Sequence, residues 1–287
     1  MGDHYLPQYY LKGFTEKSDS KFIWVYERGG TKELRTQINN IANENKLYSR
    51  EIEKLLANEI EAPANYVINK LRKLLPITQQ EKLILAKYLI VMIKRVPSGK
   101  NRFLKILPDM VVQVFDGFDE QLITMMNNNP DSSRKISRIR NKLAKIKDDP
   151  QKREEMFWIA WLTNIPAERS PRSLDAFMRM KWCFLISEKE DFITSDNPIA
   201  LSREMGIVDE KSDVSFPISK NLTLCCTWNH NLVDLTYFRA GTSNIREINR
   251  RTVKNALKYV FSNNPFDWIP DLLKKTNIRT RRIIINL

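Results

Sequence analysis

Apolar residues recur at helical spacing through residues 49–96, and this periodicity constrains the fold more than any other feature of the chain. One apolar face runs through the first part of this stretch and includes Ile52, Leu55, Leu56, Ile60, Val67, Ile68, Leu71, Leu74 and Leu75. Spacings of three and four residues put these side chains on one side of a helix. Pro63 is expected to kink or divide that helix. Thr78 followed by Glu81 is typical of a capping box and predicts the start of a second helix, which should end near residues 95–99.

The rest of the chain divides into further helices and a β-rich part. Helices are expected over 103–126 and 134–147, and after the pairs Asp149-Pro150 and Ser170-Pro171, where an N-cap residue precedes proline. A β-hairpin is expected over 22–38, turning at a glycine pair. The later segments expected as strands are 182–187, 191–194, 222–228, 232–238 and 281–286, with a helix over about 243–262 before the last of them.

These elements predict one α+β domain over residues 1–287. Its helical middle spans about 50–180, and its β-rich part spans about 181–240 and is followed by the C-terminal helix and strand. The N-terminal hairpin and the C-terminal strands are expected to form a small, mainly antiparallel sheet that packs against the helices. No internal repeat or low-complexity linker separates the two halves, so one domain is preferred to two.

Positive charge is the strongest signal in the composition. The chain has 47 Lys and Arg residues against 34 Asp and Glu, for a formal net charge of +13 at pH 7. Such a balance favours polyanionic partners, most often nucleic acid. Segment 134–147 is the most basic helix and contains no acidic residue. The residues predicted to bind nucleic acid are Arg134, Arg138, Lys142, Lys145, Arg250 and Lys254.

Several classes of protein are disfavoured by what the chain lacks. No apolar run approaches the ~20 residues that span a bilayer, and no export signal is recognised, so a cytoplasmic protein without a membrane partner is expected. With eight glycines there is no phosphate-binding loop and no dinucleotide fingerprint, so an enzyme with a nucleotide cofactor is disfavoured. Cys183, Cys225 and Cys226 lack the spacing of a zinc site and are interpreted as buried thiols. The sequence leaves open a divalent metal ion, a homo-oligomer and a partner protein.

Two short strings put reactive side chains beside residues that would hold them in place. Residues 4–14 read HYLPQYYLKGF, and the apolar residues after His4 are expected to pack this segment on the core. His4 is then either a structural residue with one hydrogen bond, or a general base or metal ligand. Residues 192–198 read FITSDNP. Asp196 is either part of a structural turn, or a carboxylate that an apolar strand delivers to a sheet edge.

Two helical residues would complete a catalytic site. Glu59 is expected on or beside the apolar face of its helix, where an unpaired carboxylate is costly, and Arg95 lies at the end of the next helix. One interpretation is a Glu–Arg pair that only joins two helices. The other is a site made of His4, Glu59, Arg95 and Asp196. Such a site has the base, the carboxylates and the cation that phosphodiester cleavage requires, with or without a divalent metal ion.

Further residues extend these strings into a pattern that spans nearly the whole chain. The pattern consists of His4-Tyr5-x-Pro7-Gln8-x-Tyr10-Leu11-x-x-Phe14, Trp24-x-Tyr26, Glu53, Glu59, Arg95-x-Pro97, Thr194-Ser195-Asp196-Asn197-Pro198, Asn249, Ala256 and Ser262. In it the chain resembles a bacterial family, the domain of unknown function 4238 family. The resemblance implies that His4, Glu59, Arg95 and Asp196 belong to one shared pattern, and it implies no reaction. Ile93 departs from the family, which often has a polar side chain there.

Three classes of function follow, in this order of preference. The first is a nuclease-like phosphodiesterase of phage-defence or toxin type, in which His4 and Asp196 are near the chemistry. The second is a non-catalytic nucleic-acid-binding module, whose affinity should fall steeply with salt. The third is a protein-interaction or regulatory domain.

Overall fold

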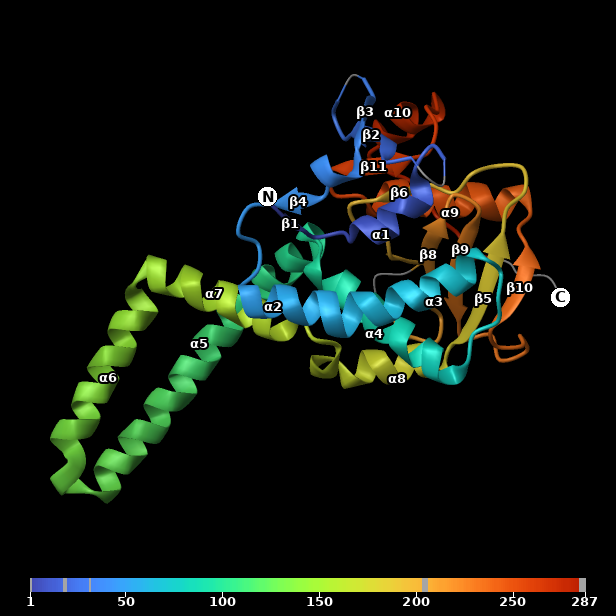
Figure 1. Ribbon diagram of the computed structural model, residues 1–287. Coiled ribbons are helices and arrows are strands. Elements are labelled where there is room, and N and C mark those ends of the chain that lie inside the picture. Colours follow the sequence, from blue (N-terminus) through green and yellow to red (C-terminus); the bar gives the residue numbers. More distant parts are fainter. Residues whose placement is uncertain (1, 18–19, 31, 203–205, 284–287) are drawn as a thin grey trace. The chain divides into compact units, whose positions relative to one another are not determined.

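The computed structural model describes residues 2–17, 20–30, 32–202 and 206–283 (Figure 1). The chain divides into two compact units, which are described in turn. The larger unit consists of Met1–Ser98 and Pro166–Leu287, and the smaller, here called the helical unit, consists of Gly99–Ile165. The mixed α+β class expected from the sequence is confirmed. The organisation as one domain stays a prediction.

The described strands of the larger unit form three sheets. A four-stranded sheet has the order β3-β2-β11-β6, a five-stranded sheet has the order β10-β5-β9-β8-β7, and β1 pairs with β4. β10 runs parallel to β5, and the other pairs are antiparallel. The bounds are β1 Asp3–His4, β2 Phe22–Glu27, β3 Leu34–Gln37, β4 Asn43–Glu44, β5 Lys181–Ile186, β6 Thr194–Ser195, β7 Ala200–Leu201, β8 Asp213–Ser219, β9 Leu222–Thr227, β10 Thr236–Arg239 and β11 Tyr259–Ser262.

The expected N-terminal hairpin is present as β2 and β3, and β2 pairs with the C-terminal strand β11. Most of the other C-terminal strands form the five-stranded sheet instead of extending this one. The sequence therefore identified the antiparallel character of the strands but not their division among several sheets.

The helices of the larger unit begin and end largely where the sequence indicates. The Thr78 hydroxyl accepts from the Glu81 N–H and the Glu81 carboxylate accepts from the Thr78 N–H, so the predicted capping box is present. α2 continues through a π-helical segment, Leu56–Glu61, into α3, and Pro63 lies in the first turn of α3 without dividing the helix. The bounds are α1 Gln8–Leu11, α2 Arg50–Leu55, α3 Ala62–Arg72, α4 Gln79–Arg95, α8 Pro171–Arg179, α9 Thr242–Asn255 and α10 Trp268–Leu273.

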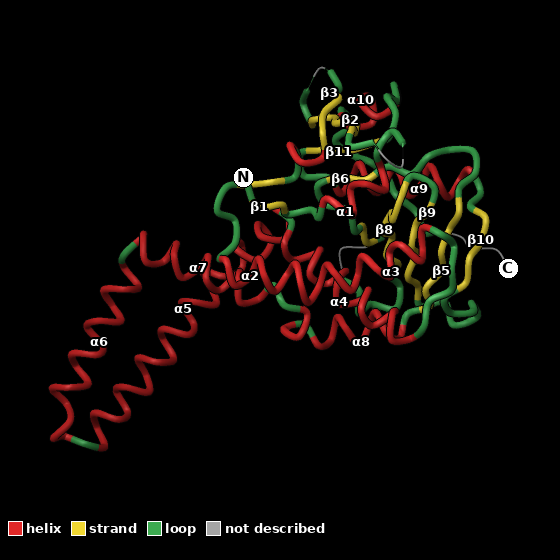
Figure 2. Tube along the Cα trace, viewed as in Figure 1, coloured by secondary structure: helices red, strands yellow, loops and turns green. Residues whose placement is uncertain are grey.

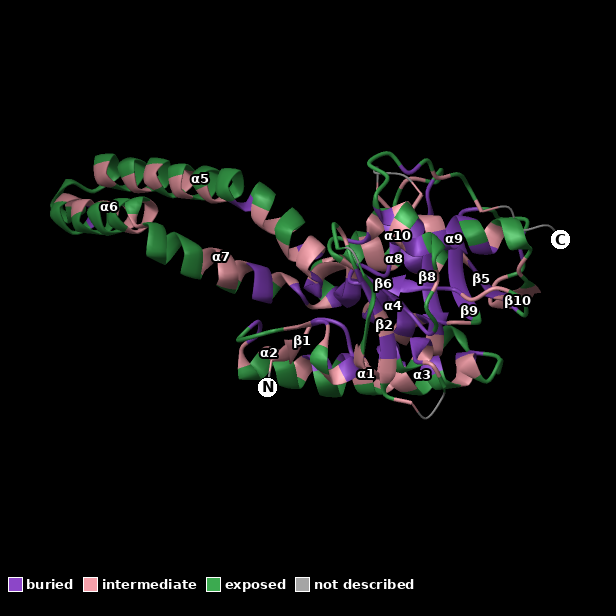
Figure 3. Ribbon diagram, turned by 90° about the horizontal axis from the view of Figure 1, so that it is seen from above, coloured by how far each residue is buried: buried purple, intermediate pink, exposed green. Residues whose placement is uncertain are grey.

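Helices cover both faces of the five-stranded sheet (Figure 2). On one face, the ring of Phe216 in β8 lies 5.1 Å from that of Tyr10 in α1 and 6.3 Å from that of Tyr88 in α4. On the other face, Ile245 and Ile248 of α9 pack with Leu185 and Cys225 of the sheet, among other residues. Because successive side chains of a strand point to opposite faces, a strand enclosed in this way is buried on both sides. Figure 3 accordingly shows β8 and β9 as buried strands.

α9 also packs on the four-stranded sheet. Its residue Val253 is buried in one cluster with Tyr26 of β2 and Val260 of β11, and with Ile269 and Leu273 of α10. One helix therefore contributes its apolar face to two sheets, with Ile245 and Ile248 near its start and Val253 near its end.

The helical unit consists of long helices. Its elements are α5 Pro97–Asn128, which begins in the larger unit, α6 Ser133–Asp148 and α7 Pro150–Asn164. Ion pairs join α5 to α6, with Arg140 bound to Asp119 at 2.6 Å and Lys147 bound to Asp116 at 2.8 Å. The Asp149 side chain accepts from the backbone N–H of Gln151 at the start of α7, which confirms the predicted N-cap.

Some boundaries differ from those expected. The helix predicted over 243–262 ends at Asn255, and residues 259–262 form β11 instead. β8 was not predicted, because Pro217 and a bulge between Pro217 and Ser219 interrupt its pattern. The segment 191–194 is a strand only from Thr194, and 232–238 only from Thr236. Residues 281–283 are not a strand, and the rest of that expected strand lies outside the described residues.

Within the described part of the chain, every helix is either too short or too polar to cross a bilayer.

Candidate functional site

The two strings singled out in the sequence meet in the structure through a buried tyrosine. The Tyr10 hydroxyl donates to the carbonyl of Pro217 at 2.9 Å, and its oxygen lies 2.6 Å from the hydroxyl oxygen of Thr194. Since a tyrosine has one hydroxyl proton, Thr194 donates to Tyr10. Both side chains are completely buried. The N-terminal segment therefore folds back on the strand that precedes Asp196.

The Asp196 carboxylate binds three consecutive backbone N–H groups. It accepts from Leu257 at 2.8 Å, from Lys258 at 2.6 Å and from Tyr259 at 2.9 Å. These residues lie where the chain leaves α9 and enters β11, and Asp196 lies where the chain passes from β6 to β7. Burial raises the pKa of Asp196, and the three hydrogen bonds oppose that increase.

His4 lies in β1 and is held by its backbone. Its carbonyl accepts from the Arg95 guanidinium at 2.5 Å. The imidazole Nε2 is buried and has no hydrogen-bond partner among the described residues. Burial lowers the pKa of His4, with a smaller lowering from the Arg95 charge, and the backbone of Asn39 raises it. The Nε2 atom is thus enclosed, although the residue as a whole is only half-buried.

Arg95 is buried at the end of α4 and binds three groups. Besides the His4 carbonyl, it donates to the Glu61 carboxylate at 2.5 Å and to the Tyr48 hydroxyl at 3.3 Å. The carboxylate beside Arg95 is therefore that of Glu61 and not that of Glu59. Glu59 is exposed, so its expected position at the apolar face is wrong. The reason is the π-helical segment, whose wider turn shifts the helix face between residues 56 and 61.

The structure thus brings His4 and Arg95 together, links Asp196 to a different set of partners and leaves Glu59 at the surface. Asp196 is 2% exposed and Arg95 is 3% exposed, so both groups are used in internal contacts. In the described residues no three His, Cys, Asp or Glu side chains form a cluster that would hold a metal ion. The catalytic roles of these four residues stay predictions.

The basic residues predicted to bind nucleic acid lie at the surface of two helices. Arg134, Arg138, Lys142 and Lys145 are exposed on α6, and the described residues include no ion-pair partner for them. We call these four residues the α6 basic stripe. On α9, Lys254 is exposed, and Arg250 is partly exposed and bound to Glu247 at 2.8 Å.

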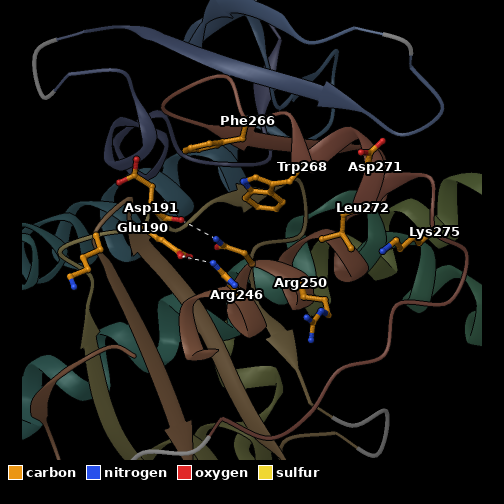
Figure 4. Close-up of a pocket in the computed structure, with 11 residues that line it drawn as sticks. Glu190, Asp191, Arg246, Arg250, Phe266, Trp268, Asp271, Leu272 and Lys275 are labelled. Carbon is orange, nitrogen blue, oxygen red and sulfur yellow. Dashed lines mark hydrogen bonds and ion pairs between the residues drawn. The ribbon is translucent and has the colours of Figure 1, made fainter. Parts of the chain in front are cut away.

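Arg250 also lines a cavity of about 650 Å³ in the larger unit (Figure 4). α9 contributes Arg246, Asn249 and Arg250 to this cavity, and α10 contributes Trp268. The rings of Phe266 and Trp268 lie 5.9 Å apart, centre to centre, at its wall.

Comparison with known proteins gives a family and no described activity. The family model described as "Protein of unknown function (DUF4238)" matches residues 3–266. The chain belongs to the DUF4238 family. No curated protein and no solved structure matches it. Within this DUF4238 chain, the matched range includes His4, Glu59, Arg95 and Asp196, and also Trp24, Asn249 and Ser262.

Sequence reasoning missed Glu61, Tyr48, Trp268 and Lys275. Glu61 could not be chosen over Glu59, because a π-helical turn has no clear sequence signal. Trp268 and Lys275 lie beyond the last motif that the sequence offered, and only the folded chain brings them to the cavity that Arg250 lines.

The Arg95 network provides a first test. We expect Glu61→Gln to lower the free energy of unfolding by about 3 kcal/mol, because a buried guanidinium loses its carboxylate partner. Glu59→Gln is the matched control and should change it by less than about 0.5 kcal/mol. Urea denaturation of both variants measures the difference. Equal effects would contradict the assignment of Glu61 as the partner.

Asp196 provides a second test. Asp196→Ala leaves three N–H groups without their carboxylate acceptor, and we expect a loss of roughly 3 to 6 kcal/mol of unfolding free energy. Asp175→Ala, at an exposed carboxylate of α8, is the control and should be nearly neutral. Thermal and urea unfolding would measure both. An Asp196→Ala variant as stable as the wild type would show that the carboxylate is not structural.

The lowered pKa of His4 predicts a pH dependence of stability. Its pKa in the folded chain is below the ordinary value of 6.5, so the unfolded chain binds the proton more tightly. The contribution of His4 to stability is therefore complete above pH 6.5 and is lost as the pH falls toward the folded-state pKa. We expect His4→Gln to reduce the decrease in melting temperature between about pH 7.5 and pH 5.5. His230→Gln, at the other and exposed histidine, should keep the wild-type decrease.

Proposed function

We propose that this chain binds nucleic acid through the α6 basic stripe. The observation that supports the proposal is the arrangement of Arg134, Arg138, Lys142 and Lys145, which recur every three or four residues and are all exposed. Residues at these spacings share one helix face, and the stripe extends over about 16 Å at about 1.5 Å per residue. A duplex presents one negative charge per ~1.7 Å, so a stripe of this length faces several phosphates.

The pairing of two further basic residues in α6 supports the same proposal. Arg140 and Lys147 point to α5, where Asp119 and Asp116 neutralise them. α6 has seven basic residues and one acidic residue over 133–148. The charge that remains unneutralised is therefore gathered on one side of the helix, where a polyanion replaces the counterions.

Binding is the part of the predicted function that the geometry supports best. The Asp196 carboxylate and the Nε2 atom of His4 are buried, so cleavage of the bound strand is not part of this proposal. A nuclease activity and a role in phage defence or as a toxin stay predictions from the sequence. The expected cytoplasmic location is part of the proposal, because nucleic acid is the partner.

The experiment compares two variants with the same loss of charge. The first replaces Arg134, Arg138, Lys142 and Lys145 with Gln, which keeps a good helix former at each position. The control replaces Lys46, Arg50, Lys54 and Lys73, four exposed cations of the larger unit, with Gln. Binding to a duplex of random sequence is measured by fluorescence anisotropy over a range of salt concentrations.

We expect the α6 variant to bind at least about tenfold more weakly than the control. We also expect the slope of log K against log salt to decrease by up to about 3.6, because each phosphate contact contributes about 0.9. An equal loss in both variants would mean that only the net charge matters. Unchanged binding by the α6 variant would overturn the proposal.

A further inference from the structure

We propose that the cavity lined by α9 and α10 binds a nucleotide, that is, an aromatic base that bears a phosphate. Trp268 and Phe266 would contact the base, and Arg250 and Lys275 would bind the phosphate (Figure 4). This site shares no residue with the α6 basic stripe and does not rest on the proposed function. Its volume of about 650 Å³ is that of an ordinary small-molecule site.

The aromatic wall of this cavity is fixed by the core. α10 buries Ile269 and Leu273, while the neighbouring Trp268 is 39% exposed. Phe266 packs against the same cluster, and its N–H donates to the Tyr26 hydroxyl at 2.6 Å. The two rings therefore keep an apolar surface open to the cavity. Because they are already held in place, a ligand that binds there does not have to order them. Flat aromatic surfaces of this kind stack with any nucleobase.

The charges around the cavity favour an anion. Two of its three carboxylates are in ion pairs, Glu190 with Arg246 and Asp271 with Lys274, and the third, Asp191, accepts from the Asn263 amide. In contrast, Lys189 and Lys275 are exposed and have no recorded partner in the described part of the chain. Among the described lining residues, two lysines without an ion pair therefore stand against one carboxylate, Asp191, without a cationic partner, so the charge available to a ligand is on balance positive.

Arg250 is the best positioned of these cations. One of its nitrogens binds Glu247, whose side chain is only 1% exposed, and this contact holds the guanidinium at the cavity. Its side chain is 38% exposed, so other N–H groups remain accessible to a ligand. An arginine fork suits phosphate oxygens. Asn249 beside it binds the backbone of Asp191 and Ile193, so the floor of the cavity is also fixed.

A free mononucleotide and one unit of a single-stranded nucleic acid present the same chemistry. The experiment therefore uses adenosine monophosphate and a ten-nucleotide single-stranded DNA, with adenosine and ribose 5-phosphate as half-ligands. Binding to the full chain is measured by isothermal titration calorimetry. We expect the mononucleotide to bind at least about tenfold more tightly than either half-ligand, because base and phosphate contact different residues.

The variants separate this site from the rest of the surface. Trp268→Ala should weaken binding about tenfold or more. Lys275→Gln, a substitution at an exposed side chain that does not threaten the fold, should weaken it severalfold. Lys73→Gln and Tyr66→Ala are the matched controls, at an exposed lysine and an exposed aromatic residue outside the cavity, and should bind as the wild type does. The α6 variant should also bind adenosine monophosphate normally, so failure of one proposal does not decide the other.

Comparing adenosine monophosphate with the ten-nucleotide DNA shows whether the ligand is a free nucleotide or part of a strand. DNA that binds more tightly than the mononucleotide, with both affinities reduced by Trp268→Ala, would identify a strand as the ligand. A mononucleotide that binds at least as tightly as DNA would identify a free nucleotide. The proposal is overturned if neither probe binds at millimolar concentration, or if Trp268→Ala and Lys275→Gln bind both as the wild type does.

Discussion

The carboxylate of Asp196 controls how the two main sheets are joined. It lies between β6 of the four-stranded sheet and β7 of the five-stranded sheet, and it binds the N–H groups of Leu257, Lys258 and Tyr259. Asn197 and Asn255 add a reciprocal pair of side-chain-to-carbonyl bonds between the same two segments. Backbone groups that leave a helix need new partners, and Asp196 and Asn197 provide them. The string that first suggested chemistry is thus the connection on which the fold depends.

This connection determines where α9 ends and what it covers. With residues 257–259 bound to Asp196, the chain leaves the helix at Asn255 and enters β11. The inner face of α9 then packs on both sheets, and Arg251 in the same helix binds Asp213 of β8 and Glu247 in a buried ionic cluster. Arg246, Arg250 and Lys254 are left on the outer side of α9, and the first two line the cavity beside Trp268. The contacts that stabilise the core therefore also place cations at this cavity.

The N-terminal segment has a comparable structural role. Tyr10 reaches Thr194 and Pro217, and the His4 carbonyl binds Arg95, so the segment contacts a strand, a helix and a second strand. The His4 carbonyl and the side chains of Tyr10, Arg95, Thr194 and Asp196 are then used in internal hydrogen bonds. A functional role is better sought at surfaces that these contacts position, such as the cavity of α9 and α10.

Short-range patterns in the sequence were enough to predict the elements that are stabilised by residues near one another in the chain. The capping box at Thr78, the N-cap at Asp149, the hairpin of β2 and β3 and the cations of α6 follow from residues within a few positions of one another. Tertiary structure decided what depends on distant partners. Residues 259–262 continue a helical pattern in the sequence yet form a strand. The reason is that the Tyr259 N–H donates to the Asp196 carboxylate and that β11 pairs with β2. Glu61 rather than Glu59 meets Arg95 because a π-helical turn changes the helix face, and Arg250 meets Trp268 only after α9 and α10 pack on one core.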